Sequence, residues 1–171
     1  KEMTAYRLSW AGGWIDTDPQ VIDREAGDYA NLGRPSWHGP GKIVVRRTGD
    51  HVKAAYDAEG YVVSNNMFVL NAPGTSQFRQ AVVALLNSRF MTWYFRAIQP
   101  RTGRIFAELK LVHLRDFPMP GARAWQAIEG RLAALEAEAR EGRPASATID
   151  TLVERAFEIS LQEQEVIKLS R

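Results

Sequence analysis

The sequence predicts an α+β fold in which a small mixed, mostly antiparallel sheet is packed by a long helix and followed by a C-terminal helical tail. Three observations support this fold class. Short β-branched runs gather between residues 42 and 70, apolar residues recur at helical spacing from 75 to 98, and two more such faces follow residue 120. With 171 residues, of which 45% are hydrophobic and 25% charged, the chain can bury a core of its own.

The N-terminal part predicts little regular structure. Ala5 to Asp16 has the pattern of one or two short strands that break at Gly12-Gly13. Thr17 to Gly41 is rich in Asp, Gly, Pro and Asn, so we expect a long loop with one helical turn. Because the chain starts Lys1-Glu2-Met3, we also expect it to be part of a longer polypeptide.

Four short runs of β-branched and aromatic residues predict the strands of the sheet. They are Lys42 to Arg47, Val52 to Tyr56, Tyr61 to Val63 and Met67 to Leu70. Asp57 to Gly60, between the second and third runs, has the composition of a hairpin turn. Pro73-Gly74 ends the last run.

Thr75 to Ile98 predicts one long helix that packs on the sheet and contains Asn87-Ser88, for which we predict a packing role. Pro100 ends this helix, and Ile105 to Leu111 resumes an extended pattern. Phe117-Pro118-Met119-Pro120 excludes both a helix and a central strand. We therefore place a domain edge there, between 1–120 and 121–171.

The C-terminal segment predicts helices. The apolar positions of the first two helices are Trp125, Ile128, Leu132 and Leu135, then Ile149, Leu152, Val153, Ala156 and Phe157. Gly142-Arg143-Pro144 separates them. Ser160 with Glu163 is a capping box that opens a short last helix.

Positive charge is concentrated in the middle of the chain, although the net charge is only +2. The C-terminal helices are acidic, so a polyanion would meet one surface only. Two groups of residues follow predicted rigid elements and can bind phosphates or base edges. They are Arg46, Arg47, Thr48 and Lys53, and Arg101, Thr102, Arg104 and Lys110. The alternative is that these arginines only solvate the surface and pair with carboxylates.

Several function classes are excluded or disfavoured. Cysteine is absent, which rules out disulfides and thiolate chemistry and fits a cytoplasmic protein, and no stretch is apolar enough to span a membrane. The histidines His38, His51 and His113 lack ligand-like spacing, so we predict no metal site. Glu108-Leu109-Lys110 has the acid-x-Lys pattern of metal-dependent nucleases, but its nearest candidate for a second acid, Asp57, lies across the long helix.

The five tryptophans offer aromatic faces for base stacking. Trp93 and Trp125 lie on apolar helix faces and are predicted to be core residues. Only Trp37, in a loop beside His38-Gly39-Pro40, stays a candidate stacking residue, and packing is the preferred interpretation even there.

The order of several motifs resembles the TaqI-like C-terminal specificity domain of adenine-specific DNA methyltransferases, including fused restriction-modification enzymes and phage-defence methyltransferases. These motifs are Lys42 to Thr48, Tyr56-Asp57, Gly60-Tyr61, Leu85 to Arg89, Phe106 to Lys110, Leu114, Phe117 to Pro120, and Ile149 to Val153 with Phe157, Ser160 and Glu163. The resemblance covers Lys42 to Ile167.

This resemblance implies that residues 1–120 form a DNA target-recognition domain, with double-stranded DNA as its partner. A separate N-terminal methyltransferase domain of the parent chain would bind S-adenosylmethionine and methylate adenine. Since the sequence has neither a Gly-rich cofactor loop nor an Asn/Asp-Pro-Pro-aromatic loop, we expect no enzyme activity and no cofactor in this segment. The alternatives are a protein-interaction or scaffolding module and the metal-dependent nuclease.

Overall fold

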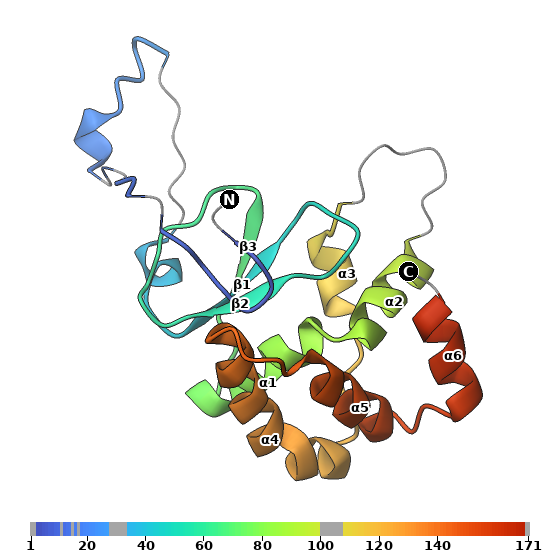
Figure 1. Cartoon of the computed structure of the whole chain (residues 1–171). Helices are drawn as coiled ribbons and strands as arrows, with labels where there is room; N and C mark the ends of the chain where they lie inside the picture. Colours follow the sequence, from blue (N-terminus) through green and yellow to red (C-terminus); the bar gives the residue numbers. More distant parts are fainter. Residues whose placement is uncertain are drawn as a thin grey trace.

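The computed structural model describes residues 3–10, 12–14, 16, 18–27, 34–99 and 108–169. A three-stranded sheet lies on one side of the molecule and a group of helices on the other (Figure 1). The predicted α+β class is confirmed. Within the described ranges, every helix falls short of the length and apolarity that a membrane span needs.

The sheet consists of β1 (Lys42–Arg46), β2 (Ala54–Asp57) and β3 (Met67–Leu70). β1 is the central strand and pairs antiparallel with both neighbours, in the order β2-β1-β3. The predicted first strand is confirmed to within one residue and the predicted last strand in full. The predicted second strand, Val52 to Tyr56, is displaced to Ala54–Asp57. The strand predicted at Tyr61 to Val63 is wrong, because those residues are not in a strand and the second neighbour of β1 is β3.

The predicted turn after β2 is confirmed and is organised by Asp57. Its carboxylate accepts hydrogen bonds from the backbone N–H groups of Glu59, Gly60 and Tyr61, at 3.0, 2.9 and 2.8 Å. The backbone at Gly60 has a φ of +86°, and a Cβ there would lie 3.1 Å from the Pro40 nitrogen. Glycine is therefore required at this close approach.

The two faces of the sheet bury different clusters. Ile43, Val45 and Ala54 join the main core on the helix side. Val44 and Ala55 lie on the opposite face of the sheet, where they pack with Met3. We call this face the outer face of the sheet. The strands expected between Ala5 and Asp16 are represented, in the described residues, by a bridge between Met3 and Leu8. Over its described residues, the loop that follows contains two 3-10 turns, Pro19–Val21 and Pro35–Trp37.

The single long helix predicted for Thr75 to Ile98 is wrong. It is two helices, α1 (Ser76–Leu86) and α2 (Arg89–Ile98). Asn87 ends α1, and its side-chain amide both accepts from the Ala54 N–H and donates to the Ala54 carbonyl, each at 2.8 Å. Ser88 then caps α2 by accepting from the Met91 N–H. Asn and Ser compete with the helix for backbone partners, and here the strand supplies those partners.

A short helix, α3 (Leu111–Arg115), was not predicted. It replaces the end of the extended segment expected at Ile105 to Leu111, of which residues 105–107 lie outside the described ranges. The C-terminal helices are α4 (Ala122–Arg140), α5 (Ser146–Ala156) and α6 (Leu161–Leu169). The predicted capping box of α6 is confirmed, since the Glu163 N–H donates to the Ser160 hydroxyl at 3.3 Å and the Ser160 N–H to the Glu163 carboxylate at 2.8 Å.

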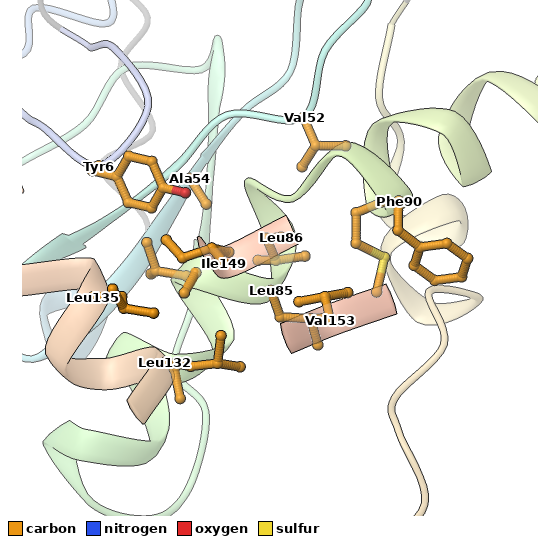
Figure 2. Packing of buried hydrophobic residues seen from close by; sticks show 14 of the residues in the cluster. Tyr6, Val52, Ala54, Leu85, Leu86, Phe90, Leu132, Leu135, Ile149 and Val153 are labelled. Carbon is orange, nitrogen blue, oxygen red and sulfur yellow. The ribbon is translucent and has the colours of Figure 1, made fainter. Parts of the chain in front are cut away.

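One hydrophobic core extends from the inner face of the sheet through α1 to α4 and α5. Figure 2 shows Leu132 and Leu135 of α4 and Ile149 and Val153 of α5 beside Leu85 of α1. Trp125 is buried in this core, as predicted, and Phe78 meets it edge-on with ring centroids 5.6 Å apart. The division of the chain at residue 120 stays a prediction.

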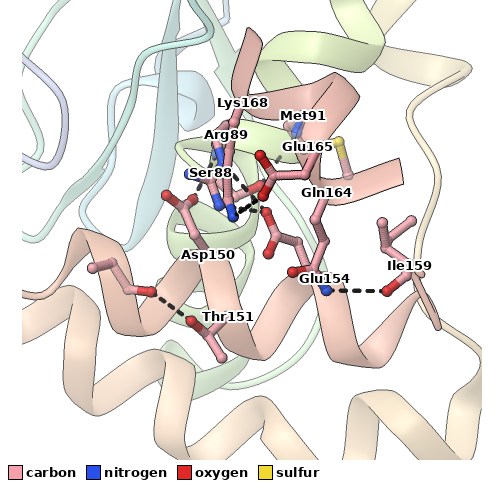
Figure 3. A network of polar contacts seen from close by, with 11 residues as sticks. Ser88, Arg89, Met91, Asp150, Thr151, Glu154, Ile159, Gln164, Glu165 and Lys168 are labelled. Carbon is pink, nitrogen blue, oxygen red and sulfur yellow. Dashed lines mark hydrogen bonds and ion pairs between the residues drawn. The ribbon is translucent and has the colours of Figure 1, made fainter. Parts of the chain in front are cut away.

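A polar network fastens the start of α2 to α5 (Figure 3). The Asp150 carboxylate accepts from the Arg89 N–H at 2.7 Å, and the Arg89 guanidinium pairs with Glu154 at 2.6 Å. Glu154 is buried, so this ion pair is shielded from solvent. The network fixes the start of α2 against α5.

Candidate nucleic-acid interface

Two segments that are distant in the sequence meet at the end of β1. Thr48 forms an antiparallel bridge with Glu108, and the Leu109 N–H donates to the Arg47 carbonyl at 2.7 Å. Leu109 is itself buried in the core. The structure therefore brings the Arg46-Arg47-Thr48 group and Lys110, which the sequence separates by more than 60 positions, to one edge of the molecule.

Arg47 is held in place by three contacts. Its guanidinium pairs with Glu108 at 2.6 Å, donates to the Asn65 carbonyl at 2.7 Å and lies over the Phe68 ring at 5.3 Å from the centroid. Its charge is partly balanced by Glu108, so it contributes less free positive charge than its neighbours. It also connects β3 to the segment that contains Lys110.

Arg46, Lys53 and Lys110 form no ion pair with any carboxylate among the described residues. The Arg46 N–H donates to the Lys53 carbonyl at 2.9 Å, and the Arg46 guanidinium approaches the Thr48 hydroxyl at 3.4 Å. Lys110 is exposed just before α3. Together with Arg47 and Thr48, these residues make up what we call the basic edge.

The loop between β1 and β2 is anchored to α2 by Arg96. Its guanidinium donates to the Asp50 carbonyl at 3.0 Å and lies 3.2 Å from His51 Nε2. Partial burial, together with the charges of Arg96 and Lys53, lowers the pKa of His51. The neutral form of the imidazole is therefore favoured, and Lys53 adds positive charge at the end of this loop.

The second predicted group is described only in part. Arg101, Thr102 and Arg104 lie outside the described residues. Gln99 precedes that segment and Glu108 follows it, and Glu108 is bonded to the basic edge through Thr48 and Arg47.

The two carboxylates of the nuclease hypothesis are both engaged in structural contacts. Glu108 pairs with Arg47, and Asp57 pairs with the buried Lys42 at 2.5 Å while it organises the turn after β2. Over the described residues, no group of three or more His, Asp or Glu side chains is arranged to hold a metal ion.

The tryptophans divide into buried and exposed. Trp125 is buried and donates to Glu129 at 2.8 Å, and Trp93 is partly buried against the core, as predicted. Trp37, the candidate singled out from the sequence, is 45% exposed, but Trp14 is 86% exposed and Trp10 is 53% exposed. The sequence pattern did not favour Trp10 and Trp14 as stacking residues, because only their position on the folded surface distinguishes them from core aromatics.

The chain matches a known protein family. The model of the TaqI-like C-terminal specificity domain matches residues 1–119. This range contains the whole sheet, α1, α2, α3 and the basic edge. The match begins well before Lys42, where the resemblance seen in the sequence began, and so includes the N-terminal segment. It ends at residue 119, so the motifs from Ile149 to Glu163 that the resemblance included lie outside it. A comparison with curated proteins finds no match.

Proposed function

Since this chain belongs to the family of TaqI-like C-terminal specificity domains, which are DNA-recognition modules of methyltransferases, we propose that it binds duplex DNA. The parent enzyme in this proposal is an adenine-specific DNA methyltransferase. A specificity domain is in general not catalytic. In this proposal, a separate methyltransferase domain of the same parent chain binds S-adenosylmethionine and methylates the adenine, in a bacterial restriction-modification or phage-defence system. The present module sets where on the duplex that domain acts.

The basic edge is the observation that supports DNA docking. Arg46, Lys53 and Lys110 come from three different segments and carry positive charge that no described carboxylate balances. Cations gathered on one edge, with acidic helices elsewhere, suit a polyanion. Phosphate contacts of this kind fix the register of a protein on the duplex without reading its sequence.

Base reading needs side chains that reach into a groove. We propose that Arg101, Thr102 and Arg104 serve this purpose, since they precede Glu108 by a few residues in the sequence and Glu108 is bridged to Thr48 of the basic edge. An arginine that binds guanine through both of its terminal nitrogens contributes about 1 to 3 kcal/mol to discrimination between bases. Replacing Arg101 or Arg104 in the full enzyme would then relax specificity at one base pair, and unchanged specificity in both variants would remove them from the interface.

The test of docking is duplex-DNA binding by the purified chain over a salt series, with no metal added. We expect affinity to fall steeply with salt, because each phosphate contact releases condensed counterions. Lys110→Gln should reduce the magnitude of the slope of log K against log[salt] by about one unit, whatever the DNA sequence.

Lys168→Gln is the matched control, since it removes one positive charge from α6, where Lys168 pairs with Glu165 at 2.7 Å. It should leave the slope unchanged. Absence of binding at low salt would contradict docking by this module, and equal effects of the two variants would show that only net charge matters.

A further inference from the structure

A hollow of about 370 Å³ opens on the outer face of the sheet. Its walls include Trp10, Trp14, Tyr61 and Met67. The two indole rings meet edge-on, with centroids 5.1 Å apart and planes at 78°, and Trp10 Nε1 donates to the Gly13 carbonyl at 2.7 Å. Two indoles held this way and left largely exposed form an apolar patch of a kind that usually marks a binding site.

Arg46 and Lys53 lie on the same face of the sheet as one wall of this hollow, although neither side chain lines it. Met67, in its wall, is the cross-strand partner of Arg46, and cross-strand partners share a face of the sheet. Lys53 lies opposite Arg46 on the other side, where its carbonyl accepts the Arg46 N–H. By strand alternation from Ala55, Lys53 faces the same outer side. Arg46 therefore lies one strand across from Met67, and Lys53 lies beyond Arg46, both on the face onto which the hollow opens.

Aromatic rings that share a face with cations match the chemistry of a nucleotide outside a stack, since the base has a flat π-face and its phosphate is an anion. An apolar peptide would use the rings but would gain nothing from Arg46 and Lys53. We propose that the hollow binds one nucleobase that has left the duplex stack, with the adjoining phosphate at Arg46 and Lys53. This inference rests on the proposed function. It adds that the outer face of the sheet binds an unstacked base of the DNA.

The test compares two duplexes of the same sequence, one fully paired and one with a single bulged 2-aminopurine. The intact chain should bind the bulged duplex about tenfold more tightly or better, because stacking of a base on an aromatic side chain contributes at that level. The 2-aminopurine fluorescence should be quenched on binding as the base stacks. The paired duplex reports on the basic edge alone.

Trp14→Ala should abolish both the preference for the bulge and the quenching, and Trp14→Phe should restore most of both. Since Trp14 is 86% exposed, its removal leaves the core intact, which circular dichroism verifies. Leu161→Ala, which removes an 80% exposed apolar side chain from α6, is the control and should change neither.

The outcomes separate this inference from the proposed function. Salt-dependent binding of the paired duplex without a preference for the bulge would overturn the base pocket and leave the docking proposal standing. Retention of the preference in Trp14→Ala would also overturn the pocket. Failure to bind either duplex would overturn the docking proposal, and the pocket with it.

Discussion

The buried ion pair between Lys42 and Asp57 should be the most sensitive polar contact in the sheet. Both residues are only 1% exposed, and Lys42 Nζ lies 2.5 Å from the Asp57 carboxylate. The same carboxylate accepts three backbone N–H groups of the turn that leads to Tyr61. Asp57→Ala therefore leaves a buried ammonium without its counterion and also removes the acceptor that shapes the turn.

The expected cost follows from the burial of both charges. Removal of one partner from a buried ion pair costs about 3 to 5 kcal/mol, because the other charge stays buried and uncompensated. A domain of this size has a free energy of unfolding of about 5 to 15 kcal/mol, so the loss is a large part of the total. Asp57→Asn should cost less, since an amide oxygen can still accept from the turn.

Urea unfolding followed by tryptophan fluorescence measures these losses through the shift of the midpoint at constant slope. The double variant Lys42→Met, Asp57→Asn should be more stable than the sum of its single variants predicts, because no charge is then buried. Glu165→Gln, which breaks an exposed pair with Lys168, is the control and should cost less than about 1 kcal/mol. A loss below about 1 kcal/mol for Asp57→Ala, or strict additivity in the double variant, would refute this reasoning.

Three further outcomes can be measured on the same chain. Asn87→Ala should lower the free energy of unfolding, measured in urea, by about 2 kcal/mol, because it leaves the buried Ala54 N–H without its acceptor. Asn87→Asp keeps an acceptor for this N–H and should cost less. Burial raises the pKa of Glu136 from 4.5 to about 7, so between these values the folded state holds a proton that the unfolded state has lost. The contribution of Glu136 to stability should be largest below pH 4.5 and be lost as the pH rises to about 7, so the stability of Glu136→Gln relative to the wild type should increase over that range. A pH-independent difference between the two proteins in urea unfolding would contradict the burial of this carboxyl. Hydrogen bonds from Ser160 lower the pKa of Glu163, so Ser160→Ala should bring that pKa back toward its ordinary value in an NMR titration. The same variant should speed amide exchange in α6, and no change in either measurement would mean that the cap does not form in solution.

The sequence by itself determined the elements whose signals are local. β-branched runs gave β1 and β3 almost to the residue, helical spacing of apolar residues gave α4 and α5, and Ser160 with Glu163 gave the start of α6. Each of these signals depends on residues within a turn or two of one another. The succession of motifs also indicated the specificity-domain family that the match over residues 1–119 shows.

Contacts between distant segments were decided only by the tertiary structure. The apolar period runs through Asn87 without interruption, and the helix ends there because the edge of β2 offers Ala54 as a partner for the Asn87 amide. Arg47 meets Glu108, and Trp14 is exposed beside Met67, through the packing of segments far apart in the chain. Pairing of charges and exposure of aromatic rings depend on which surfaces meet, and a local pattern does not contain that information.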